Sequence, residues 1–369
     1  MPDTAPKPPD QAPGEVRSIQ YLRGLAAIGV LVFHAADRAG GSFGLGAAGV
    51  DVFFVISGFI MWVVTCRRTP SPGRFLLRRF ERIVPLYWGM TLAVAAAAIL
   101  IPHAFPAMRP TFSHVGLSLL FAPHRDTTGL IAPLIVPGWT LNYEMFFYLL
   151  FAGGLLAPTR LRPWVISSAL LALVAIRPLG DATHPLWATY TNPLLLEFGA
   201  GVWLGRAWSA DRLPGRWVAG GLLALGVAGF IASALSGADI EPVRLLAWGA
   251  PALALVTGAV GLERRGLAPR LAPLRLLGDA SYSIYLAHGL AISAAFRLSQ
   301  MAGLTSPAVQ FALSLAAGVA GGLAVYQLAE KPLMRLFKTG MAARRAPGAP
   351  DTAPAVETAP AAAPATPAG

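Results

Sequence analysis

The sequence predicts an all-α integral membrane protein, a bundle of about ten transmembrane helices with both termini in the cytoplasm. Three observations lead to this fold class: the composition, the length of the apolar stretches, and the placement of basic residues between them. Of 369 residues, 55% are hydrophobic and 13% are charged, and the mean hydropathy is +0.58. Soluble domains carry about 25% charged residues, so the composition excludes a soluble globule and predicts a polytopic membrane protein.

Ten apolar stretches are long enough to cross the roughly 30 Å of hydrocarbon in a bilayer. They are residues 18–37, 47–66, 83–102, 139–157, 164–178, 190–206, 217–235, 243–262, 276–297 and 308–334. A further apolar stretch, 113–123, is too short to span. It would also invert every later loop if it did cross. We therefore expect it to be an interfacial or re-entrant helix on the outer side.

Arginines gather in alternate loops between these stretches, namely 67–82, 157–163, 206–216 and 263–275. Because cytoplasmic loops carry an excess of Lys and Arg, these four loops are predicted to be cytoplasmic. The same topology accounts for the net charge of +11, so no nucleic-acid partner is expected. The sequence divides into a cytoplasmic N-terminal segment (1–16), a membrane domain (17–338) and a disordered Ala/Pro-rich cytoplasmic tail (339–369).

The first apolar stretch contains two residues that hydrocarbon tolerates poorly, Arg23 and His34. Eleven helical positions separate them, which places both on one face and roughly 16 Å apart along the axis. An ionisable group at membrane depth costs roughly 2.5–3.5 kcal/mol on insertion scales, so such groups usually face a cavity and belong to a functional site. We expect this helix to form part of an active site.

Two carboxylates are predicted at the depth of His34. Asp51 lies near the outer end of the second span, and Glu144 lies in the outer half of the fourth. A carboxylate beside an imidazole orients the ring and keeps it basic enough to take a proton from a hydroxyl. His34, Asp51 and Glu144 are therefore the candidate catalytic residues. An alternative is that each carboxylate pairs with an arginine and holds two helices together.

At the cytoplasmic start of the third span, Arg79 and Arg82 are three residues apart and share a helix face. Forked guanidinium groups at this spacing suit the phosphate oxygens of a cytosolic donor. The neighbouring arginines of this loop are explained by topology alone. Further residues that could line the same cavity are Ser57, Tyr148, Glu197, Tyr285 and His288. No group of residues has metal-ligand spacing, so no metal is expected.

Five segments in order closely resemble the membrane acyltransferase-3 family. They are the Arg23-to-His34 spacing, Gly-Val-Asp-Val-Phe-Phe-Val-Ile-Ser-Gly-Phe (49–59), Arg-Phe-Glu-Arg (79–82), Trp-Thr-Leu-Asn-Tyr-Glu (139–144) and Ser-Tyr-Ser-Ile-Tyr-Leu-Ala-His (281–288). The resemblance runs from about residue 17 to 335. The sequences at residues 18–27 and 137–148 are similar to those of the family branch that acetylates bacterial exopolysaccharides.

The resemblance implies a multi-pass protein of the bacterial inner membrane. It implies transfer of an acetyl or other short acyl group from cytosolic acetyl-CoA, or another acyl-CoA, to a hydroxyl of an exopolysaccharide or its lipid-linked precursor. His34 then matches the essential histidine of the family, and Arg23, Arg79 and Arg82 match arginines that handle acyl-CoA. The expected partners are the lipid bilayer, the saccharide acceptor and, as a candidate, the machinery of polysaccharide synthesis or export. Direct transfer and a transient acyl-enzyme on His34 or Ser57 both remain open.

Two other functional classes are compatible with buried polar residues. A polytopic transporter or proton-coupled flippase also needs buried carboxylates, histidines and arginines. A non-catalytic subunit that scaffolds a polysaccharide complex is the third class. The Arg79 and Arg82 pair, with His34 at the far end of the predicted path, favours an enzyme with a large anionic donor.

Overall fold

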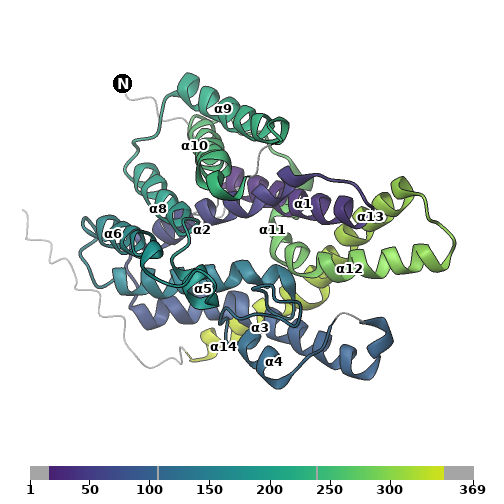
Figure 1. Cartoon of the computed structure of the whole chain (residues 1–369). Coiled ribbons are helices and arrows are strands. Elements are labelled where there is room, and N and C mark those ends of the chain that lie inside the picture. The colour runs from purple at the N-terminus through teal and green to yellow at the C-terminus, as the bar shows by residue number, and fades with distance from the viewer. Residues whose placement is uncertain (1–15, 106–107, 238–239, 345–369) are drawn as a thin grey trace, which may run out of the picture.

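The computed structural model describes residues 16–105, 108–237 and 240–344, and the regular elements in these ranges are helices (Figure 1). This confirms the all-α prediction. The predicted N-terminal segment before residue 16 and the tail after residue 344 lie outside the described residues. The last helix continues to Arg344, six residues beyond the predicted boundary of the membrane domain.

In chain order the α-helices are α1 (Arg17–Arg38), α2 (Gly49–Thr65), α3 (Pro72–Leu100), α4 (Phe112–Leu119), α5 (Trp139–Gly154), α6 (Arg162–Ala175), α7 (Pro185–Tyr190), α8 (Leu195–Ser209), α9 (Arg216–Leu235), α10 (Ala250–Arg264), α11 (Ala272–Asp279), α12 (Ser281–Met301), α13 (Pro307–Val325) and α14 (Lys331–Arg344). Two π-helical turns, η6 (Leu245–Gly249) and η7 (Tyr326–Glu330), lead directly into α10 and α14. The short 3₁₀ turns are η1 (Gly44–Ala48), η2 (Pro102–Ala104), η3 (Val136–Gly138), η4 (Arg177–Leu179) and η5 (Glu241–Val243).

In the described part of the chain, seven helical segments are long and apolar enough to cross a membrane. They coincide with seven of the ten predicted spans. The other three predicted spans, 139–157, 190–206 and 276–297, correspond to α5, α8 and α12. α5 and α8 are shorter, with 16 and 15 residues. The side of the membrane that each loop faces stays a prediction.

The apolar stretch at 113–123 forms the eight-residue helix α4. Eight residues rise about 12 Å, far less than the hydrocarbon thickness. The helix begins at a Thr111 cap, and its last residue, Leu119, accepts a hydrogen bond from the Trp88 indole of α3 (2.8 Å). Phe112 and Leu120 are exposed, as expected for an element that lies at an interface.

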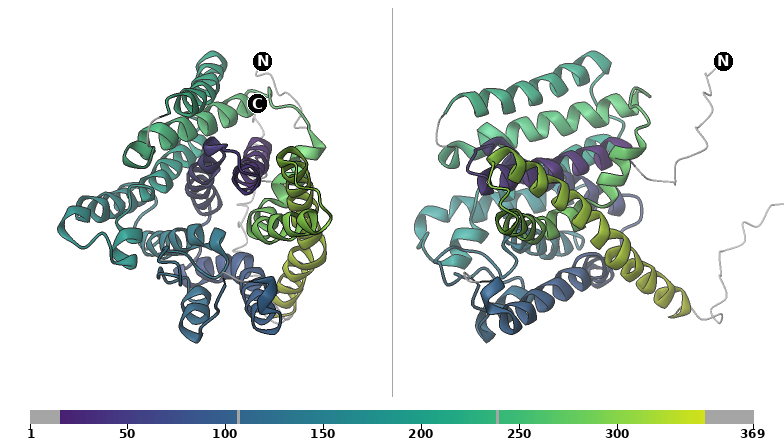
Figure 2. Two further views of the ribbon diagram at one scale, coloured as in Figure 1. Left: turned by 45° about the vertical axis from the view of Figure 1, so that its right-hand side comes forward. Right: turned by 90° about the vertical axis from the view of Figure 1, so that its right-hand side faces the viewer.

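The bundle surrounds α1 and α2 (Figure 2). α9 and α10 lie on one side of this central pair, and α12 and α13 lie on another. α2 is mostly buried by its neighbours, whereas in α9 the buried residues are Ala219 and Gly226. Because α1 and α2 carry Arg23, His34, Asp51 and Ser57, the central position of these helices places the candidate polar residues inside the protein.

α2 and α8 pack with their backbones in contact. A Cβ added at Gly58 would overlap the carbonyl oxygen of Phe198, and a Cβ at Gly201 would overlap that of Val55. Small residues permit this approach between membrane helices. The two glycines therefore fix α2 against α8 along the wall that carries Ser57.

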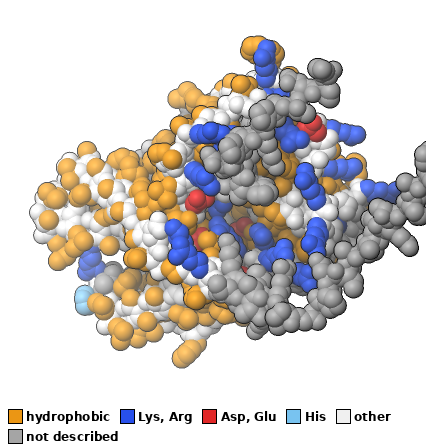
Figure 3. Space-filling view, turned by 180° about the vertical axis from the view of Figure 1, so that it is seen from behind, with side chains coloured by type: hydrophobic (Ala, Val, Ile, Leu, Met, Phe, Trp, Pro, Cys, Tyr) orange, Lys and Arg blue, Asp and Glu red, His pale blue; other side chains and the backbone are white. Residues whose placement is uncertain are grey.

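The start of α1 and the end of α14 lie at the same end of the bundle (Figure 2). At this end Glu263, in the last turn of α10, accepts hydrogen bonds from the backbone N–H groups of Arg17 and Ser18 (2.9 and 2.7 Å). Figure 3 shows Lys and Arg side chains gathered on one part of the surface, beside a face that is mostly hydrophobic. A topology with basic loops on one side predicts such a gathering, and which side faces the cytoplasm stays a prediction.

Candidate active site

A cavity of about 430 Å³ lies between the central helices and α3, α5 and α12. Its volume falls in the range of small-molecule sites, about 300–1,000 Å³. The polar and charged residues that line it are Gln20, Arg23, Ser57, Arg79, Arg82, Thr140, Glu144, Tyr148, Asp279, Ser281, Tyr282, Tyr285 and Tyr326. The remaining lining is apolar and includes Val50, Phe53, Phe54, Ile56 and Leu141.

The cavity brings together Arg23, Arg79 and Arg82. Arg23 Nη1 donates a hydrogen bond to Gln20 Oε1 (3.2 Å) one turn earlier on α1. The Arg79 guanidinium lies 6.0 Å from the centroid of the Phe75 ring. Among the described residues, neither Arg23 nor Arg79 has an ion-pair partner within 4 Å. These two cations therefore remain available to an anionic ligand.

Arg82 is held more firmly. Its Nη1 atom lies 3.4 Å from Glu330 Oε1 and also donates to the Met334 sulfur (2.9 Å). Glu330 is buried and ends the π-helical turn η7, and Ser283 of α12 donates to its other oxygen (2.5 Å). The ion pair thus links α3 to the C-terminal helices at the edge of the cavity.

Glu144 faces the cavity and receives two hydrogen bonds on one oxygen. Ser57 Oγ of α2 donates to Glu144 Oε1 (3.2 Å), and Tyr148, one turn later on α5, donates to the same atom. The predicted candidates Glu144, Ser57 and Tyr148 therefore form one hydrogen-bonded cluster. They share their cavity with the arginines, not with His34.

His34 lies beyond the wall of the cavity. Its half-buried ring contacts the ring of His288 on α12, with centroids 5.0 Å apart and planes tilted by 31°. His288 in turn contacts Tyr285 (centroids 5.8 Å apart), and Tyr285 lines the cavity. The Tyr285 hydroxyl lies 3.1 Å from Thr140 Oγ1 on α5. Tyr285 and His288 thus form the connection between the cavity and His34.

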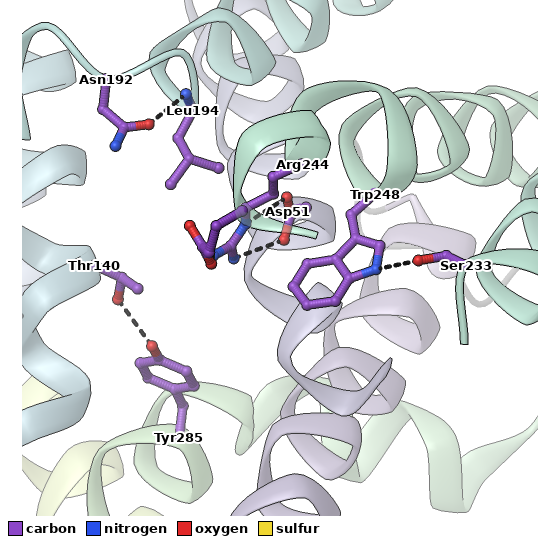
Figure 4. A network of polar contacts seen from close by, with 9 residues as sticks. Asp51, Thr140, Asn192, Leu194, Ser233, Arg244, Trp248 and Tyr285 are labelled. Atoms are coloured by element: carbon purple, nitrogen blue, oxygen red, sulfur yellow. Dashed lines mark hydrogen bonds and ion pairs between the residues drawn. The ribbon is translucent and has the colours of Figure 1, made fainter. Parts of the chain in front are cut away.

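Asp51 has a different environment from the one predicted. It is fully buried and accepts hydrogen bonds from Arg244 Nε (3.2 Å) and Nη2 (3.0 Å) on the turn before α10 (Figure 4). The Arg244 guanidinium also lies over the ring of Trp248. Among the contacts of the described residues, none joins Asp51 to His34. The placement matches the alternative interpretation, an arginine pair that holds two helices together.

Glu197 of α8 lies beside Asp51 and away from the cavity lining. It is buried, and its carboxyl group shares a side-chain hydrogen bond with the carboxyl group of Asp51. Gly249 at the end of η6 packs against it, because a Cβ at this glycine would come within 2.7 Å of Glu197 Oε1. The structure thus places this predicted cavity residue in the Asp51 and Arg244 cluster.

Sequence reasoning missed several residues of these two regions. Arg244 was not singled out, although it stands at the predicted outer end of the span 243–262, where the excess of arginine in cytoplasmic loops does not account for it. Tyr282 belongs to the segment 281–288, yet its hydroxyl donates to the Ile83 carbonyl (2.8 Å) at the cavity wall. Asp279 and Tyr326 line the cavity from helix ends, for which local sequence gives no signal.

Comparison with known proteins identifies the family of the chain. Residues 16–327 match the family described as an acyltransferase domain. The exopolysaccharide production protein ExoZ of Rhizobium meliloti is 44% identical over 306 residues, which cover 83% of this chain and 95% of that protein. The acyltransferase MdmB of Streptomyces mycarofaciens is 29% identical over 391 residues, covering 93% and 96% of the two chains.

The peptidoglycan O-acetyltransferase OatA of Listeria monocytogenes is a more distant relative, with 29% identity over 222 residues. That match covers 54% of this chain and 35% of OatA. No solved structure matches the chain. The comparisons favour the enzyme over the transporter, flippase and scaffold interpretations considered from the sequence.

Proposed function

Since the chain belongs to the acyltransferase-3 family of membrane enzymes, we propose that it transfers an acetyl or other short acyl group from cytosolic acyl-CoA to a saccharide hydroxyl. The acceptor is an exopolysaccharide or its lipid-linked precursor, in the inner membrane of a bacterium. The acceptor class follows from the similarity to a protein of exopolysaccharide production. The arginine-lined cavity supports the donor class.

The cavity, with two arginines that have no ion-pair partner within 4 Å among the described residues, is the observation that carries the proposal. Arg23 and Arg79 are partly exposed to the cavity, and a cation at membrane depth without a counter-ion is costly, so both are expected to meet an anion there. Phosphate and pyrophosphate groups satisfy guanidinium donors bidentately. In the proposed complex, the CoA phosphates bind Arg79 and Arg82, and the pantetheine arm runs past Arg23 into the apolar part of the cavity.

The chemical step needs a base for the acceptor hydroxyl. In the proposed step, His34 takes the hydroxyl proton as the oxygen attacks the thioester carbonyl, a contribution of typically 10²–10⁴-fold. The new C–O ester bond forms, the C–S bond breaks, and the proton passes to the departing thiolate. Because Tyr285 and His288 connect the cavity to His34, the thioester must pass these two rings to reach the base.

The Glu144 cluster offers a second place for chemistry within the same function. Ser57 Oγ donates to Glu144 (3.2 Å) inside the cavity, where the thioester would pass. Transfer through a transient acyl group on Ser57 is therefore an alternative route. Unlike direct transfer, it would leave the protein covalently labelled by the acyl group during the reaction.

The test is the O-acetyl content of cell-surface polysaccharide, measured by proton NMR. A deletion strain is complemented with the wild-type chain, His34→Ala or Arg79→Ala at matched membrane levels. We expect acetyl signals with the wild type, near-complete loss with His34→Ala and strong reduction with Arg79→Ala. Equal acetylation in the deletion strain and all complemented strains would refute the saccharide acceptor.

A further inference from the structure

The contact between His34 and His288 joins two residues that are 254 positions apart in the sequence. His34 lies in the outer part of α1, and His288 lies in the first half of α12. The two rings face one another at 5.0 Å between centroids with a tilt of 31°. His34 is half-buried, so one side of its ring is accessible, whereas His288 is fully buried.

The hydrogen bond of His288 defines its protonation pattern. Its Nδ1 atom lies 2.5 Å from the Tyr285 carbonyl oxygen. A carbonyl oxygen only accepts, so Nδ1 must carry the proton. In the neutral imidazole the other nitrogen, Nε2, then bears only a lone pair. The backbone carbonyl of α12 thereby fixes the tautomer of His288.

Nε2 of His288 is a buried acceptor that has no donor among the described residues. Leaving such a group unsatisfied costs about 1–3 kcal/mol, so its position calls for an explanation. The neighbouring ring that offers a ring N–H is His34. The other aromatic neighbour, Tyr285, directs its hydroxyl to Thr140 Oγ1.

We propose that His288 is a positioning residue for His34. In the reacting complex, the His34 ring turns so that one of its N–H groups donates to this Nε2, which leaves the other His34 nitrogen unprotonated and directed toward the acceptor hydroxyl. This inference rests on the proposed function, in which His34 is the base. His288 then performs with a neutral imidazole the orienting task that a carboxylate performs in a Ser-His-Asp triad.

Every proton in the proposed step is accounted for. The hydroxyl proton moves to the free nitrogen of His34 as the C–O bond forms, and His288 stabilises the resulting imidazolium by accepting its other N–H. The same proton then moves from His34 to the CoA thiolate as the C–S bond breaks. His288 keeps its own proton on Nδ1 throughout and requires no further reactant.

Two substitutions separate the roles of the two nitrogens. In His288→Asn, the side-chain amide reaches the position of Nδ1 and retains a donor for the Tyr285 carbonyl, but it offers nothing at the position of Nε2. In His288→Gln, the amide oxygen reaches the position of Nε2 and can accept from His34. A purely structural role would make the Asn variant the milder change. The proposed role makes Gln the milder change.

The assay uses the full-length protein in inverted membrane vesicles, with radiolabelled acetyl-CoA and saccharide extracted from the membranes. We expect His288→Asn to lower kcat about 10- to 100-fold, less than the loss of the base itself, with the KM for acetyl-CoA unchanged. His288→Gln should recover most of the rate. Membrane levels and thermal stability of both variants are measured alongside.

The outcomes distinguish this inference from the function on which it rests. A wild-type chain that labels no saccharide refutes the proposed function. An active wild type and an inactive His34→Ala, together with an Asn variant as active as the wild type, refute the role of His288 alone. An Asn variant that is more active than the Gln variant assigns His288 to packing and also overturns the inference.

Discussion

The two arginine sites within this bundle differ in how their charge is compensated. Arg244 is locked to the fully buried Asp51 by two hydrogen bonds of 3.2 and 3.0 Å. Arg23 and Arg79 line an open cavity and have no ion-pair partner within 4 Å among the described residues. Paired charges in a membrane interior hold helices together, whereas unpaired ones indicate where a charged ligand enters.

This difference changes the roles that the sequence predicted for Asp51 and Glu144. Asp51 and Glu144 were expected to share one task beside His34. The structure instead gives Asp51 a cation and gives Glu144 two hydroxyl donors. Substitutions at the Asp51 site should therefore act first on stability, and substitutions in the cavity should act first on turnover.

The largest effect is expected for Arg244→Ala, which leaves a buried carboxylate without its cation. Breaking a buried pair on one side costs about 3–5 kcal/mol, so the purified protein should show a much lower melting temperature in detergent. The double variant Asp51→Asn with Arg244→Gln should recover most of that stability. If the double variant is folded but inactive, Asp51 has a chemical role besides its ion pair. An Arg244→Ala protein as stable as the wild type would contradict the stabilising role of the Asp51–Arg244 pair.

The next effect is expected for Arg79→Ala in the cavity. Hydrogen bonds to a charged group contribute about 1.5–3 kcal/mol, so the KM for acyl-CoA should rise about 10- to 100-fold while the melting temperature stays close to that of the wild type. The matched control is Arg78→Ala, because Arg78 is the preceding residue on α3, is exposed and does not line the cavity. Equal effects of the two substitutions would contradict an anion site at Arg79.

Ser57→Ala tests whether the Glu144 cluster only binds or also carries the acyl group. Loss of one hydrogen bond of about 0.5–1.5 kcal/mol predicts a decrease in rate of at most about tenfold. An acyl-enzyme on Ser57 predicts complete loss of activity instead. The measurement combines turnover with the label that remains on denatured protein after exposure to radiolabelled acetyl-CoA.

The smallest effect is expected for Tyr285→Phe. The change removes the contact between the Tyr285 hydroxyl and Thr140 (3.1 Å) but keeps the ring between the cavity and His288. A neutral hydrogen bond of about 1 kcal/mol corresponds to roughly a fivefold change in turnover. A loss as large as that of His34→Ala would show that the hydroxyl takes part in the chemistry.

Helix positions were largely predictable because the length and hydropathy of each apolar stretch determine them. The stretch at 18–37 became α1 (Arg17–Arg38), and 217–235 became α9 (Arg216–Leu235). Other boundaries depend on local caps. α3 begins within the predicted arginine loop because Ser71 caps its first turn and Pro72 suits the first helical position.

The break between α11 and α12 at Ala280 was not predicted. It divides the expected span 276–297 without a proline or glycine at the junction. Packing of the neighbouring Gly278 against the backbone of Gln20 on α1 accompanies the break. A tertiary contact of this kind leaves no periodic signal in the sequence.

For the candidate site, the sequence predicts a depth for each residue but not its direction around the helix. Hydropathy placed Asp51 and Glu144 at a similar level, but which neighbour each one faces depends on how the helices are rotated and ordered in the bundle. Arg244 is 193 residues from Asp51, and His288 is similarly remote from His34. Short motifs identified Arg79 and Arg82 more securely because both residues stand on one helix face.

The glycine contact between α2 and α8 limits how this sequence can diverge. Any side chain at Gly58 or Gly201 would collide with a carbonyl of the opposite helix, so no compensating change in side chains can relieve it. A saturation library should therefore tolerate substitutions on lipid-facing α9 and reject almost every one at these two positions. Such intolerance would arise without any contact to substrate, and a conservation profile alone would mistake it for catalysis.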